Sequence, residues 1–346
     1  MTKAIIALED GTCFEGTAFG AEGEVLGEVI FNTQVVGYQE ILTDPANRGK
    51  LVCMGYPLIG NYGINDRCNE SGKGQAAALI VKENSRVYSN WQAKESLADF
   101  MQKQNIVGIE GIDTQALTVY IRDHGEMRGI VSTVCFDKDE LVKKTKEYVI
   151  PNLAEMKSQI TNLASASRGS PKSQTNSKMV VINLGVNHST LAKYPGGEVV
   201  AYDTAPEEIL KNAPEQVVIS SGPGDPTKLQ GTIDTVKQLI GKVSLYGIQN
   251  GACVLALALG CQVSKMKVGH HGVNYPVVDP KTGKGEISAQ NHSFGVDKLA
   301  AGVKAFHVNL NDKTIEGFRS SDGKCVGTLY FPIDERSKLP AGYQYV

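Results

Sequence analysis

The stretch with the clearest chemical potential lies between an apolar run that ends at Ile248 and an Ala/Leu-rich run from Ala252 to Leu259. The first run predicts a buried strand and the second a helix, so the chain must turn sharply at 247–251. Glycines two residues before and after the centre of such a turn are typical of a nucleophile elbow, because only glycine lets strand and helix approach so closely. The centre here is Gln249, and a carboxamide cannot act as the nucleophile. The sequence therefore predicts the geometry of a reactive site without its reactive group.

A Gly-rich segment precedes the elbow by one strand-and-helix unit. It reads S-S-G-P-G-D-P, from Ser220 to Pro226, and follows a predicted strand. Backbone N–H groups of such a loop can form one half of an oxyanion hole, and the N–H of Asn250 would form the other half. The segment alone could be an ordinary turn. Its place before the elbow is what favours the oxyanion hole.

The elements that must position these groups begin with a predicted β-rich α/β domain over residues 1–136. The Tyr- and Gly-rich stretches 37–45 and 56–63 are most simply turns of that domain. The other elements expected are a hairpin around Asp10-Gly11, a strand Glu28–Asn32, a helix Glu95–Gln104, and a strand and Asp113-capped helix within Ile106–Gly125.

Residues 137–177 change in composition and predict a helical segment followed by a polar linker rich in Ser, Asn, Gly and Pro. From 178 to 346 strand and helix patterns alternate as far as the elbow, which indicates a mainly parallel central sheet. After the elbow the patterns predict a succession of strands without helices between them.

Length and composition set broad limits. A chain of 346 residues fits two domains, and 41% hydrophobic with 21% charged residues is ordinary for a globular protein. A formal net charge of −2 offers no field that would gather nucleic acid or an anionic membrane, so neither is expected as a partner.

The seven cysteines are scattered and never form a C-x-x-C pair, which predicts free thiols and no metal site. The first residues lack a signal-peptide pattern, and no uncharged run approaches the roughly 18 residues of a transmembrane helix. A cytoplasmic protein without metal or other cofactor is expected.

Motifs along the whole chain resemble the small subunit of carbamoyl-phosphate synthetase, and the second domain resembles a class I (triad-type) glutamine amidotransferase. The motifs are E-D-G-T-C-F-E-G, F-N-T-Q-V-V-G-Y-Q-E-I-L-T-D-P and Y-P-L-I-G-N-Y-G in the first domain, and S-G-P-G-D-P, K-M-K-V-G-H-H-G-V-N-Y-P-V and A-Q-N-H-S-F in the second. The motifs of the first domain are the more specific, because that domain is peculiar to this subunit.

The resemblance implies a Cys-His-Glu glutaminase triad whose positions have changed here. Gln249 stands at the Cys position, and the late segment L-Y-F-P-I-D-E puts Phe331 at the His and Ile333 at the Glu position. No catalytic residue is therefore expected, and the chain is expected to be shortened after this segment, where the family adds a helix.

The resemblance also implies a vestigial glutamine pocket. Four of its positions depart from the family pattern, and four match it. The departures are Ala46, Asn250, Cys253 and Ser293, and the matches are Gly222, Gly224, Asn291 and Phe294. From its place one helical turn after Gln249, Cys253 is expected to be a small buried residue. A further hypothesis is that the Gln249 carboxamide imitates the substrate and plugs the pocket, and the alternative is that the position is merely unconstrained.

The family's small subunit releases ammonia for a large subunit, in arginine and pyrimidine biosynthesis. The expected function is a non-catalytic subunit that forms a heterodimer with the large subunit of an ammonia-dependent synthetase. Two alternatives stay open, a free-standing regulatory or binding pseudoenzyme and an active glutamine-hydrolysing subunit. Glutamine or another small molecule is a further expected ligand of the pocket.

Overall fold

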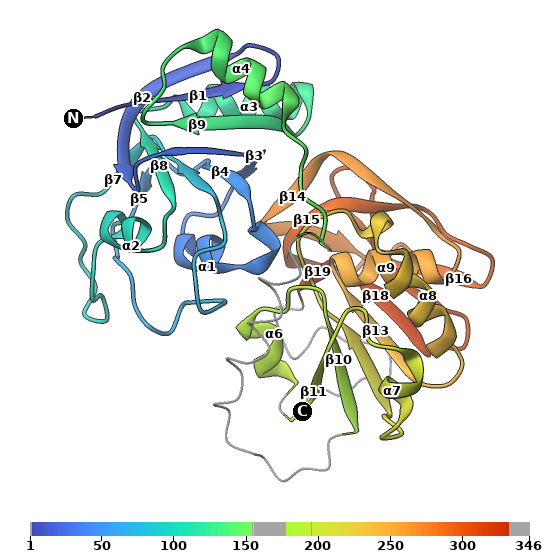
Figure 1. Ribbon diagram of the computed structural model, residues 1–346. Helices are drawn as coiled ribbons and strands as arrows, with labels where there is room; N and C mark the ends of the chain where they lie inside the picture. Colours follow the sequence, from blue (N-terminus) through green and yellow to red (C-terminus); the bar gives the residue numbers. More distant parts are fainter. Residues whose placement is uncertain (1, 154, 156–177, 195, 332–346) are drawn as a thin grey trace. The chain divides into compact units, whose positions relative to one another are not determined.

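The computed structural model describes residues 2–153, 155, 178–194 and 196–331 (Figure 1). The chain forms two compact units. The first contains the residues up to Ile150 together with Lys267–His271, and the second contains Pro151–Met266 and the residues from Gly272 onward. The predicted polar linker and Ile333 lie largely or wholly outside the described residues.

The first unit is built on a closed β-barrel. Its first two strands form the predicted hairpin, with Lys3 opposite Thr17. The strands follow the order β1-β2-β8-β6-β4-β3-β9 around the barrel. Their bounds are β1 (Lys3–Leu8), β2 (Cys13–Gly20), β3 (Glu24–Asn32), β4 (Lys50–Met54), β6 (Ala78–Ile80), β8 (Val107–Glu110) and β9 (Met127–Ser132), with a separate pair β5 (Leu58–Ile59) and β7 (Glu83–Asn84).

Helices cover this barrel and complete its core. The elements are α1 (Tyr38–Thr43), a 3-10 turn Pro45–Asn47, α2 (Leu97–Lys103), α3 (Thr114–His124) and α4 (Lys138–Glu147). Ser96 caps α2 and Asp113 caps α3, which ends at Gly125 with φ 102°, so both predicted helices are confirmed.

Two elements of the first unit differ from expectation. The stretch after Gly37 is a helix and not a turn, because Tyr38 is fully buried, donates to the Gly63 carbonyl at 2.7 Å and stacks on Tyr62. Helix α4 lies within residues 137–177, which the sequence predicts to be a helical segment and a linker between the domains. It packs instead on β1 and β9 of the barrel and buries Leu141.

The second unit contains a ten-stranded mixed sheet in the order β11-β10-β12-β13-β18-β17-β16-β14-β15-β19. The first five strands pair in parallel, and β17 turns the rest antiparallel. The parallel strands are β10 (Met179–Asn183), β11 (Glu198–Ala201), β12 (Gln216–Ile219), β13 (Ser244–Ile248) and β18 (Cys325–Thr328). The others are β14 (Gln262–Val278), β15 (Gly285–Lys298), β16 (Val303–Asn309), β17 (Ile315–Ser320) and β19 (Tyr330–Phe331).

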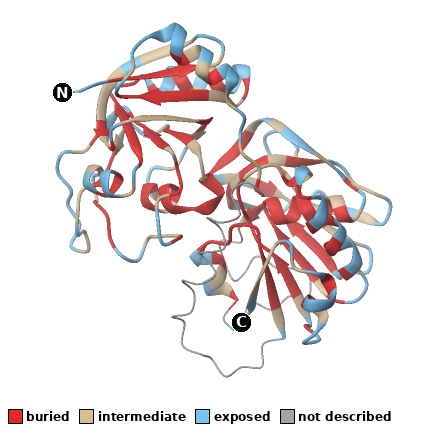
Figure 2. Ribbon diagram, viewed as in Figure 1, coloured by how far each residue is buried: buried red, intermediate tan, exposed pale blue. Residues whose placement is uncertain are grey.

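The helices of the second unit are α6 (His188–Lys193), α7 (Pro206–Leu210), α8 (Gln230–Leu239) and α9 (Asn250–Ala258), with a 3-10 turn Pro226–Lys228. The predicted alternation of strands and helices, and the run of strands after α9, are confirmed. Helix α6 is not predicted by the sequence pattern. Helices α8 and α9 pack together, and their apolar side chains join those of the sheet in one core, which Figure 2 shows as buried residues.

The middle of β14 belongs to the first unit. Glu126 Oε1 accepts a hydrogen bond from Gly269 N at 2.7 Å and lies 3.0 Å from His271 Nε2, and both side chains are 1% exposed. Burial raises the pKa of Glu126, but the hydrogen bond and charge of His271, the charge of Lys50 and the Gly269 N–H outweigh it and lower this pKa to about 2.

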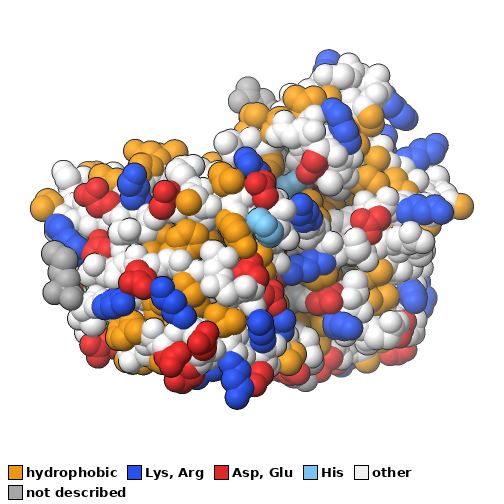
Figure 3. Space-filling model, turned by 90° about the horizontal axis from the view of Figure 1, so that it is seen from above, with side chains coloured by type: hydrophobic (Ala, Val, Ile, Leu, Met, Phe, Trp, Pro, Cys, Tyr) orange, Lys and Arg blue, Asp and Glu red, His pale blue; other side chains and the backbone are white. Residues whose placement is uncertain are grey.

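Acidic and basic side chains are interspersed on the face drawn in Figure 3. In the described part of the chain, none of the helices combines the length and the apolar character needed to cross a membrane.

Candidate functional site

The predicted elbow is present at the junction of β13 and α9. Gln249 has φ 50° and ψ −115°, in a backbone region that non-glycine residues rarely adopt. Its N–H donates to the Thr328 carbonyl at 2.8 Å, and its own carbonyl accepts from Cys253 N at 3.0 Å, the first bond of α9. The strand-to-helix turn is therefore held from both sides.

Gly247 and Gly251 allow the close approach of strand and helix that the sequence predicts. A Cβ on Gly251 would lie 2.1 Å from the Ile219 carbonyl oxygen, and one on Gly247 would lie 2.6 Å from Ala252 Cα. Both contacts are far inside van der Waals distance, so only glycine permits this approach of α9 to the sheet.

The Gln249 side chain is 1% exposed and points into the protein. With the amide oriented by its hydrogen-bonding partners, the nitrogen donates to Ser221 Oγ at 2.9 Å and to the Asn291 carbonyl at 3.2 Å. The amide oxygen accepts from Asn291 N at 3.1 Å. One side chain thus links the elbow, the Gly-rich loop and β15.

Asn250 holds the Gly-rich loop. Its Nδ2 donates to the carbonyl oxygens of Gly222 at 2.7 Å and Gly224 at 3.1 Å. A Cβ on Gly222 would lie 2.0 Å from the Leu184 carbonyl oxygen, and Gly224 has φ 83°, so the loop needs both glycines. The oxyanion-hole role of the loop N–H groups stays a prediction.

Cys253 is fully buried, as expected from the sequence. Its Sγ lies 3.8 Å from the Phe294 carbonyl oxygen. Burial, and next the charge of Glu316, raise the pKa of this thiol far above its usual value. The nucleophilic thiolate form is therefore strongly disfavoured.

The remaining candidate residues fall in different places. Asn291, Ser293 and Phe294 follow one another on β15, while Ala46 is buried in the 3-10 turn Pro45–Asn47 of the first unit. Phe331, which the sequence predicts to stand at the position of the family's His, lies on β19 opposite Ala289 of β15. It packs against an apolar cluster that includes Tyr246, Ile248 and Val326.

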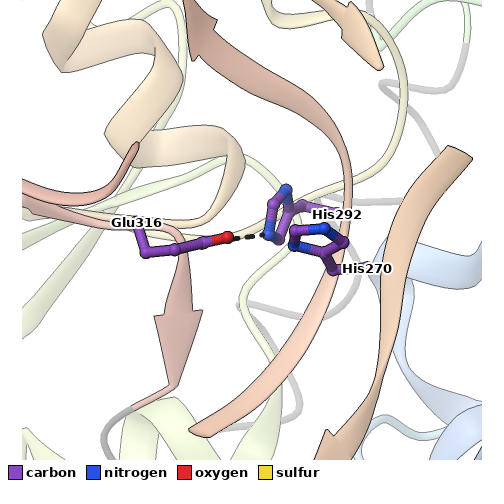
Figure 4. A group of neighbouring side chains, drawn as sticks. All are labelled: His270, His292 and Glu316. Carbon is purple, nitrogen blue, oxygen red and sulfur yellow. Dashed lines mark ion pairs between the residues drawn. The ribbon is translucent and has the colours of Figure 1, made fainter. Parts of the chain in front are cut away.

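A buried pair that sequence spacing does not reveal is drawn in Figure 4. His292 Nε2, on β15, lies 3.6 Å from a Glu316 carboxylate oxygen, on β17, and both residues belong to the second unit. His292 Nδ1 also lies 2.9 Å from the Phe294 carbonyl oxygen. Because the two residues come from different strands, no local spacing signals the pair.

Two family models match the chain. Residues 6–131 match the carbamoyl-phosphate synthase small chain, CPSase domain, and residues 190–332 match glutamine amidotransferase class-I. A solved structure of a glutamine amidotransferase from Thermotoga maritima is 18% identical and covers 44% of this chain and 74% of its own, with a TM-score of 0.35.

Curated relatives match over nearly the full length. The carbamoyl phosphate synthase small chain of Aquifex aeolicus is 41% identical over 99% of this chain and 96% of its own. That of Maridesulfovibrio salexigens is 42% identical over 95% of this chain and 93% of its own. With this identity and coverage, the chain belongs to the carbamoyl-phosphate synthase small chain family.

Proposed function

We propose that this chain is a carbamoyl-phosphate synthase small subunit without glutaminase activity, which binds a large subunit, and which supports the ammonia-dependent reaction of that partner. In the mechanism that the family implies, a base takes the proton of a thiol at the elbow, and the resulting thiolate attacks the carboxamide carbon of glutamine. Loop N–H groups stabilise the oxyanion, and ammonia leaves with the proton that the base returns. This chain keeps the elbow and the loop but offers neither thiolate nor base at the corresponding positions.

The observation that carries the proposal is Gln249 at the centre of the elbow. Its carboxamide is buried and is engaged with Ser221 and Asn291. An amide nitrogen is not nucleophilic, and Phe331 in an apolar cluster cannot accept a proton. Loss of nucleophile and base together lowers turnover by about 10⁶-fold in a triad enzyme.

Cys253 does not supply a substitute nucleophile. It lies one helical turn into α9, where it is fully buried and its pKa is raised. Attack would need both a thiolate and access to the substrate, and burial opposes each of them.

Binding to a large subunit is supported by the family itself, and also by the first unit. The residues that match the small-chain CPSase domain form most of the barrel and helices α1 to α3, and the barrel has an apolar core. Loss of the triad does not disturb this part of the chain, so docking can persist without catalysis.

The experiment is to mix the purified chain with the large subunit from the same source and measure complex formation by analytical ultracentrifugation, together with glutamate release from glutamine. A stable complex without glutamate release is expected. Glutamate release that depends on this chain would favour an active glutaminase subunit, and the absence of a complex would favour a free-standing regulatory module.

A further inference from the structure

The contacts of the Gln249 carboxamide define a site with its own chemical specificity. Asn291 presents a backbone N–H and a backbone carbonyl to it, and Ser221 Oγ presents an acceptor to its second N–H. Ser221 is 1% exposed, so the partners lie in the interior of the second unit. The carboxamide has one acceptor and two donors, and each of them faces a complementary group of the protein.

A primary carboxamide matches this pattern. Its oxygen accepts from Asn291 N, and its two N–H bonds reach the Asn291 carbonyl and Ser221 Oγ. A carboxylate would place a second acceptor against the Asn291 carbonyl, and an N,N-dialkyl amide would have no N–H to donate. Each mismatch leaves a buried polar group without a partner, which is the strongest source of discrimination in such sites.

The elbow backbone carries the side chain into this site. Gln249 adopts a strained φ of 50°, and its backbone bonds to Thr328 and Cys253 hold it there. A strained residue persists only when its surroundings fix it. The side-chain bonds to Ser221 and Asn291 add to this restraint.

We propose that the second unit contains a primary-carboxamide binding site that is filled by the chain's own Gln249 side chain, and that removal of this side chain opens the site to small primary amides. The group that fills the site is a side chain of the protein itself, so free glutamine cannot place its carboxamide there. Failure of this proposal can be distinguished from failure of the proposed function. Amide binding is measured without a large subunit, and ammonia-dependent synthesis does not require an open site.

The test is chemical rescue of the full-length Gln249→Gly variant. Glycine tolerates the positive φ, so the substitution removes the side chain without adding strain. Propionamide reproduces the deleted group atom for atom. The controls are propionate, N,N-dimethylpropionamide and the wild-type protein, and the readout is the melting temperature of the second unit by calorimetry.

Propionamide at ten times its dissociation constant should raise the melting temperature of Gln249→Gly by about 4 °C and leave the wild type unchanged. Propionate and N,N-dimethylpropionamide should have no such effect. An equal rise with N,N-dimethylpropionamide, an equal rise in the wild type, or no rise with propionamide would each overturn the proposal.

A second measurement covers the case in which Gln249→Gly does not fold. Gln249→Met keeps the volume of the side chain and removes the amide. In ¹⁵N-glutamine-labelled protein, the side-chain NH₂ signal that this variant lacks belongs to Gln249. Its hydrogen exchange in the wild type should be at least about 100-fold slower than that of a solvent-exposed glutamine amide, as a buried, bonded group requires. Exchange at the exposed rate would overturn the proposal.

Discussion

At the scale of single residues, position 249 combines the strained backbone of a nucleophile elbow with a carboxamide side chain. A non-glycine residue in such a region costs about 1–3 kcal/mol, and enzymes accept that cost because it exposes a nucleophile. Here the same φ of 50° presents a carboxamide. The conformation therefore belongs to the fold of β13 and α9 and does not depend on the presence of a thiol.

The first prediction concerns restoration of chemistry at this residue. Gln249→Cys alone should release no measurable glutamate from glutamine, because the new thiol has Phe331 and no imidazole at the position of the base. The triple variant Gln249→Cys, Phe331→His, Ile333→Glu should show glutamate release above that of the single variant by at least about 100-fold, the contribution of a positioned base. The assay is coupled glutamate detection with the wild type as blank. Activity of the single variant equal to that of the triple variant would contradict this account of Phe331.

The second prediction concerns Glu126 in the first unit. Removing its charge by Glu126→Gln should lower the free energy of unfolding by about 3 kcal/mol at pH 7, because one partner of a buried pair with His271 is lost. Glu140→Gln is the control, since this carboxylate is exposed and pairs with Lys144 on the surface of α4. The control should differ little from the wild type in urea unfolding.

The pH dependence of this difference follows from the lowered pKa. The folded-state pKa of about 2 lies below the ordinary value of 4.5, so the folded protein binds fewer protons than the unfolded chain. The stabilisation is complete above about pH 4.5 and is lost as the pH falls towards 2. The gap between wild type and Glu126→Gln should therefore shrink from pH 5 to pH 3. A gap that stays constant over this range would show that Glu126 does not have a lowered pKa.

At the scale of elements, the elbow depends on how closely α9 approaches the sheet. Gly251→Ala would place a methyl group 2.1 Å from the Ile219 carbonyl oxygen, and the helix must shift to relieve that contact. We predict a loss of about 1–3 kcal/mol in the free energy of unfolding, typical of overpacking. Gly231→Ala in α8 is the matched control, because its Cβ would meet nothing within 4 Å.

The control should leave stability unchanged or raise it slightly, since alanine is the better helix former. Urea unfolding followed by circular dichroism compares both variants with the wild type. Equal stability of Gly251→Ala and Gly231→Ala would contradict the view that Gly251 is needed for the close approach of α9 to the sheet.

The elements could be predicted where local pattern and tertiary environment agree. In the second unit, short apolar runs such as Val217–Ile219 and the amphipathic run of α8 predict the correct types of structure. The prediction of a turn at helix α1 is wrong, because Tyr38 and Gly37 are common in turns, whereas the burial of Tyr38, its stacking on Tyr62 and its hydrogen bond to Gly63 favour the helix. Contacts far apart in sequence decide such cases.

The same limit applies to the site. The elbow and the Gly-rich loop could be predicted, because both are local patterns with fixed spacing. The pairing of the Gln249 side chain with Ser221 and Asn291 could not, because these two residues are distant in sequence from Gln249 and Asn291 offers only its backbone. The buried pair of His292 and Glu316 could not be predicted, because its residues come from two different strands.

At the scale of the whole molecule, two compact units have separate cores and separate roles in the proposal. The barrel unit matches the carbamoyl-phosphate synthase small chain, CPSase domain, and the sheet unit, which carries the elbow at Gln249, matches glutamine amidotransferase class-I. The proposed loss of glutamine hydrolysis concerns the sheet unit, so it would leave the barrel unit folded.

The most direct measurement is the rate of carbamoyl phosphate formation by the large subunit from the same source, with and without this chain, from glutamine and separately from ammonia. The account predicts formation from ammonia, increased by at least about twofold when the chain is present, and no formation from glutamine above the rate measured without the chain. Formation from glutamine that requires this chain would contradict the central claim that the subunit is non-catalytic.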